Sequence, residues 1–156
     1  METQHKDPEI IQVENLDKFY GKTIGVKDIS FSVNHGETFG FLGPNGAGKT
    51  TTIRLLLDLL KPTSGKIQIF GNNLGTSSKA IRARCGYLPG EFQAYKHLTG
   101  YEYLALFSGY RESQSGDVDQ LIDRFRLNKN DLKREISQYS KGMHQKLGIV
   151  QAFMHK

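Results

Sequence analysis

The sequence predicts an α/β domain with an antiparallel β edge and a helical subdomain. Three patterns predict it. Apolar and polar residues alternate over 9–33, a glycine-rich loop joins a strand-like run to a helical pattern over 37–62, and leucine and aromatic residues recur at helical spacing over 98–127. The length of 156 residues suits one domain of ordinary size, or part of a larger one.

The first part of the chain predicts strands around one helix. The alternation over 9–33 predicts two strands joined by the turn YGKTIG, and the apolar run ETFGFLG at 37–43 predicts a buried strand. After the glycine loop, TTIRLLLDLLKP predicts a helix that Pro62 ends, and GKIQIFG at 65–71 predicts another strand. The expected apolar face of the helix consists of Ile53, Leu56, Leu57 and Leu60.

The second part of the chain predicts mainly helices. SSKAIRARC predicts a short helix, CGYLP at 85–89 predicts a further buried strand that Cys85 opens, and residues 98–127 predict a helical insertion. The last stretch, SKGMHQKLGIVQAFMHK, predicts a helix that Ser140 caps. The expected apolar residues of this helix are Met143, Leu147, Val150 and Met154.

Composition argues against several classes of protein. The net charge of +5 comes from scattered Lys and Arg residues without a basic run or an RNA-binding aromatic motif, so we expect no nucleic-acid partner. The most apolar run, 55–60, is far shorter than a membrane span, and residues 1–10 lack the features of a secretory signal. Cys85 is the only cysteine and the histidines lack metal-ligand spacing, which favours a cytoplasmic protein without a protein-only metal site.

A phosphate-binding loop is the most specific motif in the chain. GPNGAGKT, residues 43–50, matches the Walker A pattern GxxxxGK[ST] in full, between the predicted strand and helix that its mechanism requires. Because Gly43, Gly46 and Gly48 lack a Cβ, the backbone can curl and direct its N–H groups at phosphate oxygens, assisted by the positive end of the helix dipole. The motif therefore predicts a P-loop domain that binds a nucleotide.

Three polar side chains at the end of this loop have expected contacts. Lys49 is expected to reach the β and γ phosphates, Thr50 to place its hydroxyl on Mg²⁺, and Thr51 to add a hydrogen bond to phosphate. The predicted nucleotide-binding residues of the loop are Gly43, Pro44, Asn45, Gly46, Ala47, Gly48, Lys49, Thr50 and Thr51.

A second pattern suggests guanine binding but lacks the required context. NKND at 128–131 has the form NKxD that guanine-specific GTPases use to bind the base. Those proteins place it after a buried strand, whereas here it follows the polar, helical IDRFRL, and no DxxG occurs in the chain. We therefore expect a polar turn between helices.

The segments GPNGAGKTTTIRLLLDLLKPTSGKI and YSKGMHQKLGI resemble the ATP-binding domain of ABC transporters over residues from about 10 to 156. The second segment corresponds to the family's signature motif, usually LSGGQ, and its form is similar to that of bacterial drug, bacteriocin-type and polysaccharide exporters. The resemblance implies that Ser140 and the N–H groups at this helix start bind the γ-phosphate held by a partner subunit's P-loop; without it, Ser140 is an ordinary N-cap. The corresponding signature residues are Tyr139, Ser140, Lys141, Gly142 and Met143.

Two further positions follow from the resemblance. Tyr20 stands where the family stacks an aromatic ring on adenine, and Val26 would pad the same face; from the residues alone, Tyr20 is an aromatic of a hairpin turn. The family's Q-loop glutamine, which touches Mg²⁺ and the attacking water, aligns with Gly90, while Gln93 lies three residues late. Glu91 is the candidate substitute, and no other catalytic residue is assigned.

The resemblance also implies a longer domain and partner subunits. The Walker B strand, with the catalytic glutamate, is expected beyond Lys156, so we expect a partial domain that binds ATP and Mg²⁺ but does not hydrolyse ATP alone. Its expected parts are a catalytic core at about 10–89, a helical subdomain at about 90–140 and the signature helix at 140–156. The complete ATPase would form a head-to-tail dimer and drive export through a transmembrane permease, at the inner face of the cell membrane. The alternatives are a non-transport ABC-type ATPase acting on ribosomes or nucleic acid, and a non-hydrolysing ATP-binding fragment.

Overall fold

The computed structural model describes residues 9–110 and 115–154. The chain divides into two compact units, Met1–Arg82 and Ala83–Lys156. The predicted boundary between core and helical subdomain, at about residue 90, lies further along the chain than this division and stays a prediction about the complete domain. In the described residues no helix is long and apolar enough to cross a membrane.

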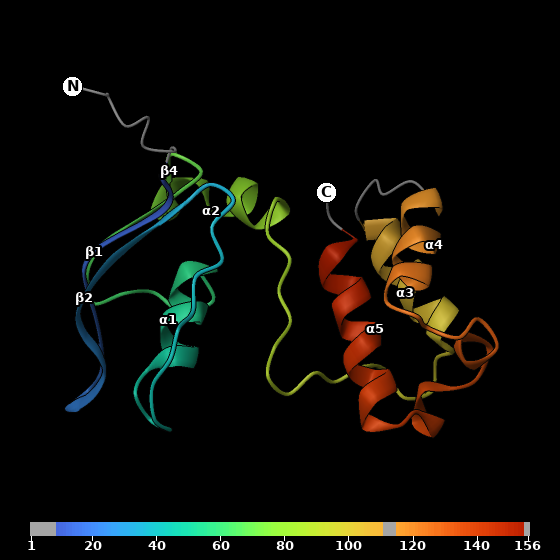
Figure 1. The fold of residues 1–156 in the computed structure, drawn as a ribbon. Helices are drawn as coiled ribbons and strands as arrows, with labels where there is room; N and C mark the ends of the chain where they lie inside the picture. Colours follow the sequence, from blue (N-terminus) through green and yellow to red (C-terminus); the bar gives the residue numbers. More distant parts are fainter. Residues whose placement is uncertain (1–8, 111–114, 155–156) are drawn as a thin grey trace. The chain divides into compact units, whose positions relative to one another are not determined.

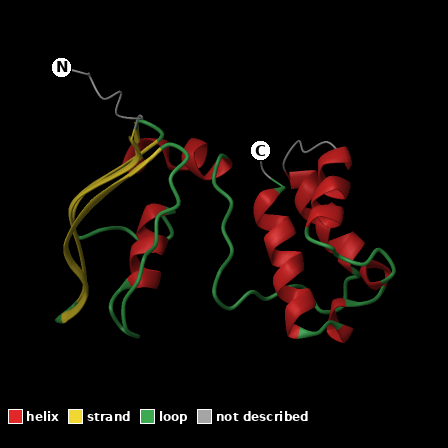
Figure 2. Ribbon diagram, viewed as in Figure 1, coloured by secondary structure: helices red, strands yellow, loops and turns green. Residues whose placement is uncertain are grey.

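The first unit is built on an antiparallel sheet (Figures 1 and 2). Its strands are β1 (Glu9–Tyr20), β2 (Thr23–Asn34), β3 (Ser64–Ile69) and β4 (Asn72–Asn73), in the order β2-β1-β3-β4. Tyr20 pairs with Thr23 across a tight turn in which Gly21 has φ 60°, a left-handed conformation that glycine adopts without steric cost. The predicted hairpin is therefore confirmed. The sheet buries Val13, Leu16, Val26, Val33, Ile67 and Ile69.

Two helices belong to the first unit, α1 (Lys49–Leu56) and α2 (Leu74–Ala83). The predicted apolar face of α1 is wrong: its buried residues are Thr52 and Leu55, and Ile53 is 38% exposed. The helix also ends earlier than predicted, because Asp58 takes φ 54° and the N–H groups of residues 58–60 turn back to carbonyls of residues 54 and 55. The leucines after residue 56 therefore leave the helical spacing on which the prediction rested.

Two predicted buried strands, 37–43 and 85–89, are not formed. A strand is stable only when its backbone N–H and C=O groups pair with a neighbour, and no described strand pairs with either segment. Phe39 stacks on Phe31 of β2 with ring centroids 5.2 Å apart, whereas Leu42 is 93% exposed. Cys85 is only half-buried, so its predicted place in a core strand is also wrong.

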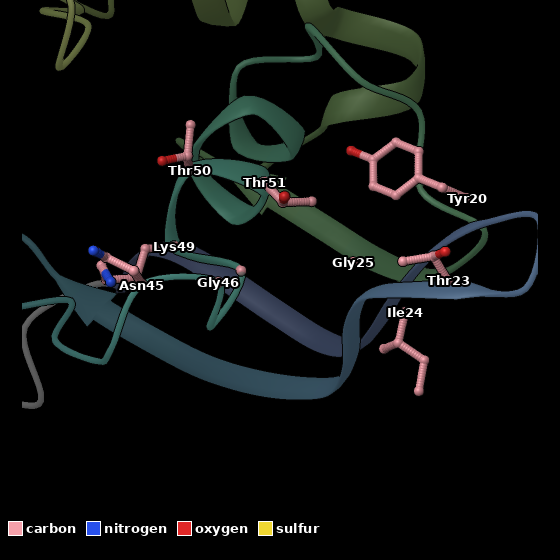
Figure 3. Close-up of a pocket in the computed structure, with 10 residues that line it drawn as sticks. Tyr20, Thr23, Ile24, Gly25, Asn45, Gly46, Lys49, Thr50 and Thr51 are labelled. Carbon is pink, nitrogen blue, oxygen red and sulfur yellow. The ribbon is translucent and has the colours of Figure 1, made fainter.

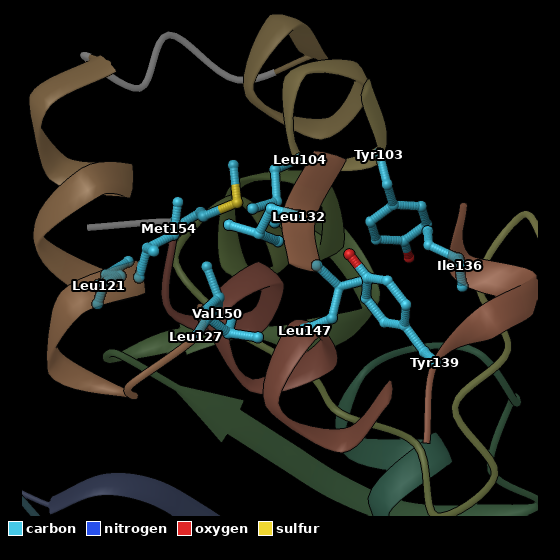
Figure 4. Close-up of a cluster of buried hydrophobic side chains, with 11 residues drawn as sticks. Tyr103, Leu104, Leu121, Leu127, Leu132, Ile136, Tyr139, Leu147, Val150 and Met154 are labelled. Atoms are coloured by element: carbon cyan, nitrogen blue, oxygen red, sulfur yellow. The ribbon is translucent and has the colours of Figure 1, made fainter. Parts of the chain in front are cut away.

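In its described residues, the second unit consists of helices and loops (Figure 2). The α-helices are α3 (Gly100–Tyr110), α4 (Ser115–Arg124) and α5 (Lys141–Phe153), and short 3₁₀ helices at Asp131–Lys133 and Ile136–Gln138 lie between α4 and α5. Figure 4 shows their apolar side chains gathered in one core. The predicted insertion and last helix are confirmed. The core residues are Tyr103, Leu104, Leu121, Ile122, Leu127, Leu132, Ile136, Tyr139, Leu147, Val150 and Met154.

The NKND segment forms the predicted polar turn. The Asn128 side-chain oxygen accepts a hydrogen bond from the Asn130 N–H at 2.8 Å, as in an Asx turn. Lys129 lies 3.4 Å from the Asp123 carboxylate, and both side chains are largely exposed. The turn connects α4 to the first 3₁₀ helix, where no buried strand precedes it.

Candidate nucleotide-binding site

The glycine loop before α1 has the backbone that its sequence predicts. Gly46 and Gly48 have φ 85° and 86°, and α1 begins directly after Gly48. A Cβ on Gly48 would lie 2.5 Å from Val26 Cγ1 and 2.6 Å from the Gly25 carbonyl oxygen. Strand β2 therefore supports the loop at a point where only a glycine fits.

The side chain of Lys49 binds the backbone at the beginning of the same loop. Its exposed ammonium donates hydrogen bonds to the carbonyl oxygens of Gly43 and Pro44, each at 2.6 Å. An ammonium has three N–H donors, so one remains after these two contacts. The charge thus lies at the mouth of the loop, where the expected phosphates would approach.

The three threonines after Lys49 have two different roles: one stabilises the loop and two line a cavity. Thr52 is buried and its hydroxyl donates to the Gly48 carbonyl oxygen at 3.0 Å, which ties the first turn of α1 to the loop. Thr50 and Thr51 instead line a cavity. No side chain among the described residues caps α1, so N–H groups of its first turn stay available to an anion.

The cavity has a volume of about 340 Å³ and joins the hairpin turn to the glycine loop. Figure 3 shows Tyr20 on one side of it, Asn45 and Lys49 on the other, and Thr51 between them. An aromatic wall facing a cationic loop across such a space suits a molecule with a flat ring and a polyanionic tail. The cavity is lined by Tyr20, Thr23, Ile24, Gly25, Asn45, Gly46, Gly48, Lys49, Thr50 and Thr51.

Tyr20 is 47% exposed and its ring rests on Gly25, where an added Cβ would lie 2.7 Å from Tyr20 Cε2. The structure therefore brings Tyr20 to the loop, as predicted, while its contact with a base stays a prediction. Val26 is 4% exposed and packs behind Gly48, outside the cavity lining. Its predicted role as padding for the base also stays a prediction.

Sequence reasoning missed Thr23, Ile24 and Gly25 in the cavity wall. One signal was available, because a glycine inside a strand often marks close approach by another group. Gly25 is such a glycine: it lies in β2, touches the Tyr20 ring, and presents its carbonyl to Gly48.

The signature segment starts α5 as predicted. The Ser140 hydroxyl oxygen accepts a hydrogen bond from the Met143 N–H at 3.2 Å, which confirms Ser140 as the N-cap. Lys141 and Gly142 are exposed, and Met143 is half-buried against the helical core. The predicted contact of these residues with a partner's nucleotide stays a prediction.

The segment aligned with the Q-loop lies beside the same helix start. Gly90 and Glu91 line a cavity of about 410 Å³ together with Lys141, His144 and Gln145. Glu91 is exposed, and its role as a substitute for the missing glutamine stays a prediction. In the described part of the chain, no group of three or more His, Cys, Asp and Glu side chains is placed to hold a metal ion.

A glycine loop at the start of a helix, a lysine at its mouth and an aromatic wall together define a P-loop nucleotide-binding protein. A sequence model of the ABC transporter family matches residues 26–156. The chain therefore belongs to the ABC transporter family.

Two relatives illustrate this membership. An uncharacterised ABC transporter ATP-binding protein of Nostoc sp. is 38% identical, over 98% of this chain and 49% of the relative. The bacitracin transport ATP-binding protein BcrA of Bacillus licheniformis is 40% identical, over 94% of this chain and 48% of the relative. The chain thus spans about half the length of the curated relatives it matches.

Solved structures agree on the fold. The ATP-binding subunit of an ABC transporter superposes with a TM-score of 0.82 at 32% identity, over 93% of this chain and 62% of that one. A dimeric ATP-binding cassette bound to ADP and Pi superposes with a TM-score of 0.80 at 24% identity, over 93% and 69%. These similarities confirm the predicted P-loop fold with its antiparallel edge and helical subdomain.

Proposed function

We propose that this chain is the nucleotide-binding part of an ABC transporter ATPase, and that ATP binds in the cavity between Tyr20 and the glycine loop. One observation carries the proposal: Lys49, from the Walker A motif, and Tyr20, which the family resemblance assigns to the base, line the same cavity. The triphosphate would lie against the loop N–H groups and Lys49, and the adenine against Tyr20.

The loop also fits a nucleotide-bound Mg²⁺. The described residues offer no carboxylate cluster for the ion, but Mg²⁺ in such sites takes most of its ligands from phosphate and water. Thr50, which lines the cavity, is the residue that would add a hydroxyl ligand. The ion would supply charge neutralisation between the phosphates, while Lys49 and the loop backbone hold their orientation.

We further propose that the complete protein exports a compound through a separate permease. Relatives named for bacitracin transport and linearmycin resistance support export, and the SKGM form of the signature supports the same subfamily. A dimeric cassette among the similar structures supports pairing of two such subunits, with Ser140 and its neighbours directed at the partner's nucleotide. Hydrolysis and attachment to the membrane through the permease belong to that complete assembly.

The nucleotide site is tested by replacing its lysine. Lys49→Ala should weaken Mg-ATP binding about 10- to 100-fold, because charge-assisted hydrogen bonds contribute about 1.5–3 kcal/mol each. Isothermal titration calorimetry of residues 1–156 measures the change. Lys66→Ala removes an exposed lysine from β3 and is the matched control, for which we expect parental affinity. Equal affinity of Lys49→Ala and the parent would contradict the proposal.

A further inference from the structure

The end of β1 that carries Tyr20 is tied to the segment that follows α1. The Thr63 N–H donates to the Asp17 carbonyl oxygen at 2.9 Å, and the Phe19 N–H donates to the Thr63 hydroxyl at 3.0 Å. The Asp17 carboxylate accepts hydrogen bonds from the Asp28 N–H at 2.8 Å and from the Ser64 hydroxyl at 2.7 Å, and these two bonds, the Asp28 bond first, lower the pKa of Asp17. These bonds fix the strand just before the cavity wall.

Lys18 adds a fourth tie, through its side chain. Its ammonium donates to the Lys61 carbonyl oxygen at 2.7 Å and lies 5.3 Å from the centroid of the Tyr20 ring. A cation at that distance is attracted to the electron-rich face of an aromatic ring, with about 0.5–1 kcal/mol at exposed sites. A backbone acceptor thus holds the ammonium in place, and from that position it also contacts the Tyr20 ring.

Tyr20 has little else to fix its orientation. It is the last residue of β1, it is 47% exposed, and its ring rests on Gly25, which offers no side chain. An exposed aromatic ring that must be ordered when a ligand binds loses rotamer freedom, and this cost weakens binding. A contact that orders the ring beforehand removes part of that cost.

We propose that Lys18 is a positioning residue for the nucleotide base: it holds the Tyr20 ring in its place at the cavity wall. The inference rests on the proposed ATP site, and it assigns to Lys18 no contact with the nucleotide. Its predicted signature is selective. Loss of the Lys18 ammonium weakens binding of a ligand with a base by about two- to fivefold and leaves binding of a bare polyphosphate unchanged.

The test compares Mg-ATP with Mg-tripolyphosphate, which has the phosphates but no base, by calorimetry on residues 1–156. Lys18→Met and Lys18→Gln remove the charge by two routes, so that one poorly folded variant does not decide the result. Lys18→Arg restores a cation and a donor. Lys22→Met, at an exposed position of the same hairpin turn, is the matched control. Each variant is also made in a Tyr20→Ala background, which completes a double-mutant cycle.

In the charge-removing variants that have a parental circular dichroism spectrum, we expect a two- to fivefold loss of ATP affinity and an unchanged tripolyphosphate affinity. Lys18→Arg should recover the parental ATP affinity. In the Tyr20→Ala background, removing the Lys18 charge should cause no further loss. An equal loss for both ligands would overturn the inference, because Lys18 would then act on the phosphates or the fold. Unchanged ATP affinity, or loss of the fold in both charge-removing variants, would overturn it too. Failure of the parent to bind either ligand overturns the proposed function itself, and the inference with it.

Discussion

The two helices whose starts are assigned to phosphate begin in opposite ways. α1 follows Gly48, which has φ 86° and no side chain, and no described side chain accepts a hydrogen bond from its first turn. α5 follows Ser140, whose backbone is extended and whose hydroxyl oxygen accepts from the Met143 N–H. The start of α1 therefore lacks a side-chain cap among the described residues, whereas the side chain of Ser140 caps the start of α5.

This difference separates ligand binding from helix stability. Unsatisfied N–H groups at a helix start are stabilised by any acceptor that reaches them, so an anion at α1 replaces the missing cap. At α5 the serine already supplies that acceptor, and its hydroxyl proton remains to be donated. We therefore expect nucleotide to stabilise the first unit, while α5 needs no ligand to begin at Lys141.

The largest expected effect on stability comes from adding a methyl group to the glycine that precedes α1. Gly48→Ala combines a left-handed backbone, about 1–2 kcal/mol for a residue with a Cβ, with overpacking against Val26 and the Gly25 carbonyl, about 1–3 kcal/mol more. Gly46 has nearly the same φ but open space around it, so Gly46→Ala should cost only the backbone term. Urea denaturation followed by circular dichroism measures both. Equal losses would show that β2 does not support the loop.

The same local rules explain what could be predicted from the sequence. The hairpin turn, the glycine loop and the Ser140 cap each depend on residues within a few positions of one another, and all three are confirmed. The helical unit follows from leucine and aromatic spacing, which is local too.

Most of the failures involve partners far along the chain. Segments 37–43 and 85–89 have strand-like composition, yet a strand also needs a paired neighbour, which composition does not reveal. The buried face of α1 depends on where Asp58 ends the helix and on what Thr52 and Leu55 pack against. Thr23 and Ile24 line the cavity because the hairpin lies next to the glycine loop, a contact that spacing alone does not encode.

Removing the cap that closes α5 should have a smaller effect. Ser140→Ala leaves the Met143 N–H without its side-chain acceptor and should cost about 1 kcal/mol of unfolding free energy. Thermal denaturation measures the loss. Ser137→Ala, which removes an exposed hydroxyl that donates to the Glu135 carboxylate, is the control and should change little. ATP affinity of the isolated chain should stay at the parental value, since Ser140 is assigned to a partner's nucleotide; reduced affinity would contradict that assignment.

The smallest effect concerns the residue just before the cap and depends on pH. The Tyr139 hydroxyl donates to the Asp131 carbonyl oxygen at 3.0 Å, and burial, reinforced by the Asp131 charge, raises the pKa of Tyr139 above its ordinary value of 10.0. The folded state therefore favours the neutral phenol. Its contribution to stability is fully present below pH 10.0 and is lost as the pH rises through the folded-state pKa, because the unfolded chain ionises first.

Tyr139→Phe isolates this contribution. At pH 8 the variant should be less stable by about 0.5–1 kcal/mol, in the lower part of the range of about 0.5–1.5 kcal/mol for one hydrogen bond. Above pH 10.0 the parent loses stability through ionisation of Tyr139 in its unfolded state, and the variant cannot, so the difference between the two should shrink. Tyr103, whose pKa burial raises to about 12, is present in both proteins and cancels in the comparison. Urea denaturation at a series of pH values measures the difference. A difference that stays constant through pH 11 would mean that the folded state does not hold the Tyr139 phenol neutral.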